Sequence, residues 1–322
     1  MNGLSTLNAG LGVRQGEPKP KRALLLVNRH ARQAQHSVSR VVRELRSLGL
    51  ELFEEYPEGP LDWPGIIRSY QNRVDVAIVG GGDGTLNGAI EGLVDTGLPL
   101  GILPLGTAND LARTLGIPLS LPEACRAIAF GNLHYIDLGW VNGKYFFNVA
   151  SFGLSVQITE RLSKEAKRRW GVFAYAIAAL QAMWQARPFS AEIRHQGESV
   201  SVKTIQIAVG NGRYYGGGMT VAHDATIDDR RLDLYSLEIE RWWQVIPLIP
   251  ALRQGRYSRT FGVRTLECQE IEVYTRRPYP INTDGEITSY TPARFRVIPS
   301  ALAVIIPQKS TKPEMRYRGI VV

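Results

Sequence analysis

The sequence predicts an α/β region with a parallel sheet, followed by an all-β region. Three observations predict this fold class. Apolar, β-branched runs alternate with helix-type spacing in the first third of the chain. Glycine-rich turns directly follow two of these runs, and short alternating strands separated by turn residues fill the chain from about Tyr135 onward. The first pattern is typical of helices covering a parallel sheet, and the last is typical of a β-sandwich or barrel.

In the first region, strands are expected at residues 23–28, 50–55, 74–80 and 99–106. Helices are expected at residues 38–48, from residue 86 onward and at 109–116, because apolar residues recur there at helical spacing. Ligands of a parallel sheet bind beyond the carboxyl ends of its strands. The candidate site segments therefore lie directly after Asn28, at residues 80–85 and at residues 106–110.

The second region is expected to open with paired strands around the Asn142–Gly143 turn. A helical region at residues 158–186 interrupts the strands. Further strands are expected within residues 191–196, 198–211, 231–239, 267–275, 293–299 and 301–307. The expected organisation is a disordered leader at 1–22, an α/β region at 23–134, a β-rich region at 135–307 and a tail at 308–322.

The composition favours acidic partners, because the 322 residues carry a formal net charge of +8. Nucleotides, nucleic acid and anionic membranes all have this character. The two cysteines indicate neither a disulfide framework nor a metal cluster, and they fit a cytoplasmic protein. The N-terminal segment lacks the pattern of a secretory signal. The apolar stretch at 171–184 is too short to cross a bilayer, which takes about 20 residues.

The segment Gly80-Gly81-Gly82-Asp83-Gly84-Thr85 is expected to join a buried strand to a helix. Such a turn directs backbone N–H groups and the positive end of a helix dipole at one point, which suits a phosphate. Because Asp83 would repel a phosphate, the segment suggests that a cation lies between them. The alternative is a tight turn in which Asp83 is the helix N-cap.

Two further segments carry polar residues at turns. Residues 104–118 place a glycine, Thr107, Asn109 and Asp110 at the start of a helix, and the alternative is a plain capped helix. Asp284-Gly285-Glu286 separates two strand-like segments, and by pattern alone a plain hairpin turn is favoured there.

Two other segments leave a choice open. Asp228, Asp229 and Asp233 are able to hold a hard cation, but a solvated turn is favoured without further information. Residues 161–170 form a basic helical stretch beside aromatic residues, which fits either an anionic membrane surface or a solvated helix face.

The order of these motifs is similar to that of a known family. "GGGDGTLN", "LGILPLGTANDLARTLGIP", "IDLG", "FFNVASFG", "VGNGRYYGGGM", "DATIDDRRLDL" and "DGE" follow one another between residues 23 and 307. In this combination the chain resembles the bacterial diacylglycerol-kinase-type lipid kinases. These are relatives of sphingosine kinases and, more distantly, of NAD kinases and phosphofructokinases. The resemblance implies an N-terminal α/β domain of the NAD-kinase and phosphofructokinase type, a C-terminal β-sandwich and an active-site cleft between them.

The resemblance also implies ATP and Mg²⁺ as cofactors and residues for each role. The residues implied to bind the nucleotide are Asn28, Gly82, Asp83, Gly84, Thr85, Leu86, Asn87, Gly88 and Thr107. Asp83, Asp110 and Asp137 are implied to organise a catalytic Mg²⁺, and Asp284 is implied to be the general base. A structural Mg²⁺ is implied at the Asp229 side chain and the backbone carbonyls of Thr226 and Arg231.

The sequence departs from the family pattern at three points. Asn28 is followed by Arg29 rather than by proline, Glu55 stands near the position of a nucleotide-contacting threonine, and Asp229 is followed by Arg230 rather than by glycine.

The leading hypothesis is a cytoplasmic lipid kinase that touches an anionic membrane from one side. The alternatives are a kinase of a soluble substrate, as in NAD kinases, and a nucleotide-binding regulator without turnover. No nucleic-acid partner is expected, because the basic residues are dispersed. The sequence leaves the lipid open. It also leaves the oligomeric state open, although an edge strand of the second region is able to pair two chains into a homodimer.

Overall fold

The computed structural model describes residues 21–28, 34–57, 62–154, 156, 187–215, 219–220, 224–239, 244, 248 and 262–308. The expected helical region at 158–186, including the basic stretch at 161–170 and the apolar stretch at 171–184, lies outside these residues. The same holds for residues 216–218 and for nearly all of the expected leader and tail.

A parallel sheet forms the centre of the N-terminal unit. Its strands are β1 (Lys21–Val27), β2 (Leu50–Glu55), β3 (Val76–Gly81) and β4 (Leu100–Pro104), in the order β2-β1-β3-β4. All neighbouring pairs are parallel, which confirms the predicted α/β class. Because β1 lies between β2 and β3, the order of the strands reverses beside it. The carboxyl ends of β1 and β3 therefore meet at the point where open α/β sheets bind ligands.

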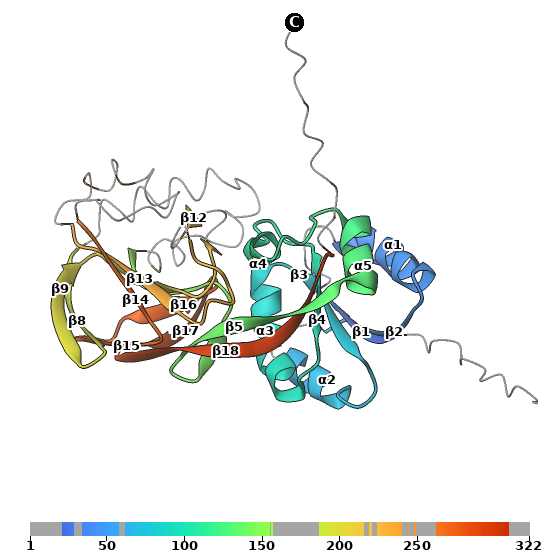
Figure 1. The fold of residues 1–322 in the computed structure, drawn as a ribbon, viewed down its shortest axis with the longest axis horizontal. Coiled ribbons are helices and arrows are strands. Elements are labelled where there is room, and N and C mark those ends of the chain that lie inside the picture. The colour runs from blue at the N-terminus through green and yellow to red at the C-terminus, as the bar shows by residue number, and fades with distance from the viewer. Residues whose placement is uncertain are drawn as a thin grey trace, which may run out of the picture.

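Helices cover both faces of this sheet (Figure 1). They are α1 (Ala34–Ser47), α2 (Trp63–Ser69), α3 (Asp83–Thr96), α4 (Asp110–Thr114) and α5 (Leu121–Phe130). Successive residues of β1 point to opposite faces, as a strand requires. Leu24 and Leu26 join the core formed with α2 and α3, whereas Ala23, Leu25 and Val27 join the core formed with α1 and α5.

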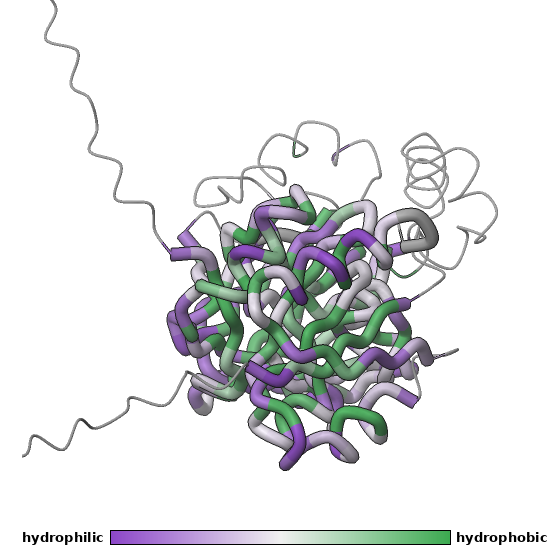
Figure 2. The backbone as a smooth tube through the Cα atoms, turned by 90° about the vertical axis from the view of Figure 1, so that its right-hand side faces the viewer, coloured by the Kyte–Doolittle hydropathy of each residue, from purple (hydrophilic) through white to green (hydrophobic). Residues whose placement is uncertain are grey.

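The C-terminal unit is a sandwich of two sheets. One sheet has the order β14-β13-β10-β7-β16-β17, and the facing sheet contributes β18, β15, β8 and β9. The strands are β5 (Asn132–Val141), β6 (Lys144–Phe146), β7 (Val149–Gly153), β8 (Phe189–His195), β9 (Glu198–Thr204), β10 (Gln206–Gly210), β11 (Tyr214–Tyr215), β12 (Met219–Thr220), β13 (Leu232–Leu237), β14 (Val263–Cys268), β15 (Glu270–Thr275), β16 (Pro280–Thr283), β17 (Glu286–Tyr290) and β18 (Ala293–Ile306). Phe146, Phe152 and Phe295 fill the space between the sheets. Hydrophobic segments run through the middle of the described chain, with hydrophilic segments around them (Figure 2).

Two long strands connect the units. β5 and β18 run antiparallel to each other from one unit into the other (Figure 1). The far end of β18 pairs with β4 in parallel, at Val304 and Leu100, while its near end pairs with β15. One sheet is therefore continuous across both units, and it fixes the C-terminal sandwich beside the carboxyl ends of the N-terminal strands.

Several elements differ from the sequence-based expectation. α3 begins at Asp83, three residues before the expected start at residue 86, so the glycine turn is shorter. The expected strands at 293–299 and 301–307 are one strand, β18, with a bulge between Ile298 and Leu302. Ser300 has a positive φ of 51° in this bulge, which lets the strand pass Pro299 and pair with β5 on both sides. α2 and α5 were not expected.

No helix among the described residues is long and apolar enough to cross a membrane.

Candidate active site

Two glycine turns pack directly against each other at the carboxyl ends of β3 and β4. The backbone N–H of Leu105 donates a hydrogen bond to the carbonyl oxygen of Gly81 at 3.0 Å. A Cβ atom on Gly106 would lie 2.4 Å from the Cα atom of Gly82. Asn109 closes the second turn, because its side chain accepts from the N–H of Gly106 and donates to its carbonyl oxygen, both at 3.0 Å. Two segments predicted separately thus form one backbone surface.

The end of β1 completes this surface. The backbone N–H of Asn28 donates to the carbonyl oxygen of Gly80 at 3.1 Å, and its side-chain Nδ2 donates to Oγ1 of Thr85 at 3.2 Å. Gly81 leaves room for Thr85, since a Cβ on Gly81 would lie 2.4 Å from the Cβ of Thr85. The structure therefore brings Asn28, the Gly82 turn and the Gly106 turn together, as the order of the strands requires.

Gly82 is the N-cap of α3, and Asp83 is its first helical residue. The alternative in which Asp83 caps this helix is therefore wrong. Oδ1 of Asp83 instead accepts a hydrogen bond from the N–H of Leu111 at 3.1 Å, at the start of α4. Asp83 thereby connects the start of α3 to the start of α4. The buried Asp110 directly precedes Leu111, the residue that donates to Asp83.

The other residues predicted to bind the nucleotide occupy different environments. Leu86 is buried in the core with α2, and its backbone N–H donates to the carbonyl oxygen of Gly82 at 3.1 Å. Thr107 is exposed in the bend between β4 and α4. Gly84 and Gly88 lie within α3.

The Asp284–Gly285 turn joins β16 to β17 and has the hairpin form that the pattern favoured. Both residues have positive φ angles, 49° and 104°. The carboxylate of Asp284 accepts four hydrogen bonds. Its Oδ2 accepts from the N–H of Phe147 at 2.7 Å and from Nδ2 of Asn87 at 3.0 Å. Its Oδ1 accepts from the N–H groups of Asn148 and Val149 at 3.0 and 3.1 Å.

These contacts determine what Asp284 is able to do. Burial raises the pKa of its carboxyl group, although all four hydrogen bonds favour the charged form. A carboxylate has about four lone-pair sites, so the four donors occupy them all. Asp284 must lose one of these bonds before it takes a proton from another molecule. Asn87 is the side-chain donor among them, and it belongs to the N-terminal unit.

Glu286, the last residue of the same turn motif, is exposed and lies over the first turn of α3. Its Oε1 is 3.4 Å from the position of a Cβ on Gly84 in the first turn of α3. Glu286 belongs to the "DGE" motif, but the sequence predicted no role for it. The feature of the sequence that could have indicated a role was a second carboxylate two residues after Asp284.

Asp137, predicted to share a catalytic Mg²⁺ with Asp83 and Asp110, is buried in a different set of contacts. Its Oδ2 accepts from the N–H of Arg230 at 2.6 Å, and its Oδ1 accepts from the N–H of Ser300 at 2.7 Å. The carboxylate thus links β5, the loop before β13 and the bulge of β18.

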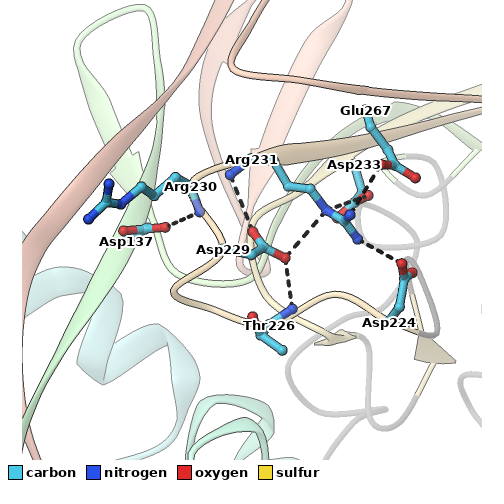
Figure 3. A network of polar contacts seen from close by, with 8 residues as sticks. All are labelled: Asp137, Asp224, Thr226, Asp229, Arg230, Arg231, Asp233 and Glu267. Atoms are coloured by element: carbon cyan, nitrogen blue, oxygen red, sulfur yellow. Dashed lines mark hydrogen bonds and ion pairs between the residues drawn. The ribbon is translucent and has the colours of Figure 1, made fainter.

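A resident metal centre finds no support in the described residues, because no group of three or more Asp, Glu, His or Cys side chains is arranged there to hold a metal ion. The predicted structural metal site also has a different arrangement. Asp229 accepts hydrogen bonds from the N–H groups of Thr226 and Arg231, at 3.0 and 3.2 Å. The guanidinium group of Arg231 lies beside the same carboxylate (Figure 3). The residues present here do not fit a divalent cation held by Asp229.

The fold and the site define a class of protein. Paired glycine turns beside the N-terminus of a long helix suit the phosphates of a nucleotide, and a carboxylate-bearing turn from a second unit lies against them. This is the arrangement of a two-unit phosphotransferase.

The comparisons with known proteins agree with this class. Residues 22–141 match the model of the diacylglycerol kinase catalytic domain, and residues 148–306 match the YegS C-terminal NAD kinase β-sandwich-like domain. The chain belongs to this lipid-kinase family and is an ATP-dependent kinase of that class.

Individual relatives cover most of the chain. It is 34% identical over 301 residues to "Probable lipid kinase YegS-like" of Yersinia enterocolitica, covering 89% of this chain and 97% of the relative. It is 28% identical to the diacylglycerol kinase of Bacillus subtilis, over 74% of this chain and 80% of the relative. The fold is similar to that of a diacylglycerol kinase from Bacillus anthracis, with a TM-score of 0.69 and 23% identity over 90% of this chain and 98% of that chain.

Proposed function

We propose that this enzyme transfers the γ-phosphoryl group of ATP to a hydroxyl group of a membrane lipid of the diacylglycerol type, in a Mg²⁺-dependent reaction. The single observation that carries the proposal is the contact between the two units. Asn87 of α3 donates to Asp284, and Glu286 lies over Gly84. The relatives are named lipid kinase and diacylglycerol kinase, which supports a lipid acceptor.

The glycine turns are assigned to the phosphates. The Gly82 and Gly106 backbones approach each other too closely for side chains, so no Cβ atom covers this surface. The N–H of Gly106 is held by Asn109, which fixes the shape of the second turn. The dipole of the 14-residue helix α3 adds positive potential at the same point. Phosphoryl transfer depends mainly on alignment and charge neutralisation, and Mg²⁺ bound to the phosphates supplies part of the latter. Asn28 and Asp83 hold the three chain segments of this surface in register.

The acceptor hydroxyl loses its proton to a carboxylate of the turn between β16 and β17. The family resemblance implied this role for Asp284, whose lone pairs are all in use. Glu286 is exposed beside the phosphate surface and needs no rearrangement to accept a proton. We therefore assign the base to Glu286 and a positioning role to Asp284, which fixes the turn to β7 and to Asn87.

The location follows from the acceptor. A lipid hydroxyl lies at a membrane surface, so the enzyme works in the cytoplasm at an anionic membrane, to which the net charge of +8 is complementary. A homodimer through an edge strand of the sandwich is compatible with this arrangement.

The test is phosphate transfer from labelled ATP with Mg²⁺. Diacylglycerol, phosphatidylglycerol, ceramide and a sphingoid base are offered in mixed micelles, beside NAD and sugar phosphates in solution. Label in one lipid is expected. Label only in a soluble acceptor would place the enzyme with the kinases of soluble substrates. ATP binding without any transfer would favour a regulatory protein.

A second prediction concerns the link between Asn87 and Asp284. Asn87→Asp places two carboxylates about 3 Å apart, so one pKa of the pair rises in the folded state above its unfolded value near 3.9. The folded protein then binds more protons than the unfolded chain, and stability must increase as the pH falls towards that unfolded value. Thermal unfolding is measured at about pH 8 and about pH 5.

Asn87→Ala is the matched control. It removes the same hydrogen bond at a cost of about 1–2 kcal/mol but adds no charge. Loss of the Asn87 donor also raises the pKa of Asp284, but less than a second negative charge beside it does. The aspartate variant is therefore expected to regain more stability at the lower pH than the alanine variant, both relative to the wild type. Equal pH dependence of both variants would show that Asn87 and Asp284 do not interact.

A further inference from the structure

Arg231 lies at the centre of a cluster of four carboxylates (Figure 3). Its Nη2 lies 3.2 Å from Asp224, its Nε lies 3.3 Å from Asp229 and 3.4 Å from Asp233, and its Nη1 lies 3.1 Å from Glu267. These four carboxylates come from the loop before β13, from β13 itself and from β14. One guanidinium group therefore ties three parts of the chain together.

The cluster needs a cation for electrostatic reasons. Asp233 and Glu267 are directly opposite each other on neighbouring antiparallel strands, a position where like charges destabilise a sheet. Asp233 is almost fully buried, so its charge is poorly solvated and needs a partner. The Arg231 side chain is only 24% exposed, so solvent screens these charges incompletely.

The loop before β13, residues 224–231, is also attached to the junction between the two units. The N–H of Arg230 donates to Asp137, and the N–H of Asp137 donates to the carbonyl oxygen of Ile227 at 2.8 Å. Asp137 also accepts from Ser300 in β18, the strand that runs through both units. Contacts that hold this loop in place, such as those of Arg231, therefore also support the junction beside the candidate active site.

The family resemblance leads one to expect a divalent cation at Asp229, and the structure has a guanidinium group there instead. We propose that Arg231 is a built-in counter-ion that replaces a structural divalent cation in this enzyme. Nη1 of Arg231 donates a hydrogen bond to Glu267, and the other three carboxylates lie at ion-pair distance from the delocalised guanidinium charge. Because this positive charge is part of the chain, the loop keeps its conformation without a bound metal ion. Within the part of the chain that the structure describes, no divalent cation is then needed apart from the one that accompanies the nucleotide.

The experiment measures thermal unfolding of the full chain without nucleotide. The protein is compared in EDTA, in excess magnesium chloride, in excess calcium chloride and in sodium chloride of equal ionic strength. The wild-type midpoint is expected to be the same with either divalent salt as with sodium chloride. Arg231→Gln is expected to lower the midpoint by about 5 °C. Magnesium or calcium ions should then restore part of the loss, because they replace the missing charge.

Two other variants control the result. Arg194→Gln removes an exposed arginine from its ion pair with Glu192 and should change neither the midpoint nor the response to divalent ions. Arg231→Lys keeps one positive charge, so it should be more stable than Arg231→Gln and should gain less from divalent ions. It also keeps the test usable if the glutamine variant does not fold.

Three outcomes would overturn the proposal. The first is a wild-type midpoint that rises with magnesium or calcium beyond the sodium chloride control. The second is an Arg231→Gln variant as stable as the wild type. The third is a destabilised Arg231→Gln variant that divalent ions do not help, since Arg231 would then act through packing alone. None of these measurements depends on catalysis, so they stand apart from the proposed kinase activity.

Discussion

Replacement of Glu286 by glutamine is expected to lower kcat by about 100-fold or more, the usual size of a general-base contribution. The substitution keeps the size of an exposed side chain, so the unfolding midpoint should not change. ATP binding should persist, since Glu286 adds negative charge beside the phosphate surface and its removal does not weaken anion binding. The measurements are kcat, KM for ATP and thermal unfolding, with the exposed Glu198→Gln on β9 as the matched control.

Asp284→Asn is expected to behave differently. An amide NH₂ group in place of one carboxylate oxygen would face N–H donors, either of Phe147 and Asn87 or of Asn148 and Val149. Donors left without an acceptor cost about 1–3 kcal/mol each. This variant should therefore lose both stability and activity. If Asp284→Asn stayed fully stable but inactive while Glu286→Gln kept its turnover, the base would be Asp284, as the family resemblance implied.

The second large effect is expected at Gly106. In Gly106→Ala, the new Cβ would lie 2.4 Å from the Cα of Gly82 and 2.8 Å from Oδ1 of Asn109. Backbone atoms cannot yield as a side chain does, so the two glycine turns must move apart. Overpacking of this kind costs about 1–3 kcal/mol, and the displaced turns should lower the affinity for ATP by at least about 10-fold.

Gly65→Ala is the matched control for this substitution. Gly65 lies in α2, and a Cβ there meets no atom within 4 Å. Alanine favours a helix over glycine by up to about 1 kcal/mol, so this variant should be as stable as the wild type or more stable. ATP affinity is measured by calorimetry for both variants. An unchanged affinity in Gly106→Ala would separate the Gly106 turn from the nucleotide site.

Much of the fold follows from local pattern. Each strand of the N-terminal sheet was expected within two residues of its observed ends, because buried parallel strands are short apolar runs between turns. The hairpin at Asp284 and Gly285 was also expected, because Asp-Gly suits two successive positive φ angles. The start of α3 was placed too late. Its first turn contains Asp83, Gly84 and Thr85, which carry no apolar periodicity.

By itself, the sequence determined the α/β and β-rich regions, the glycine turns and the family, because these depend on residues close together in the chain. The tertiary structure alone decided which polar groups meet. Asn87 and Asp284 are 197 positions apart, and no local pattern predicts their hydrogen bond. The side chain of Arg231 takes the place expected for a metal ion because strand pairing brings Glu267 opposite Asp233 and leaves a charge to be balanced. Long-range pairing, which brings distant segments together at an entropic cost, thus fixed the chemistry that local propensity left open.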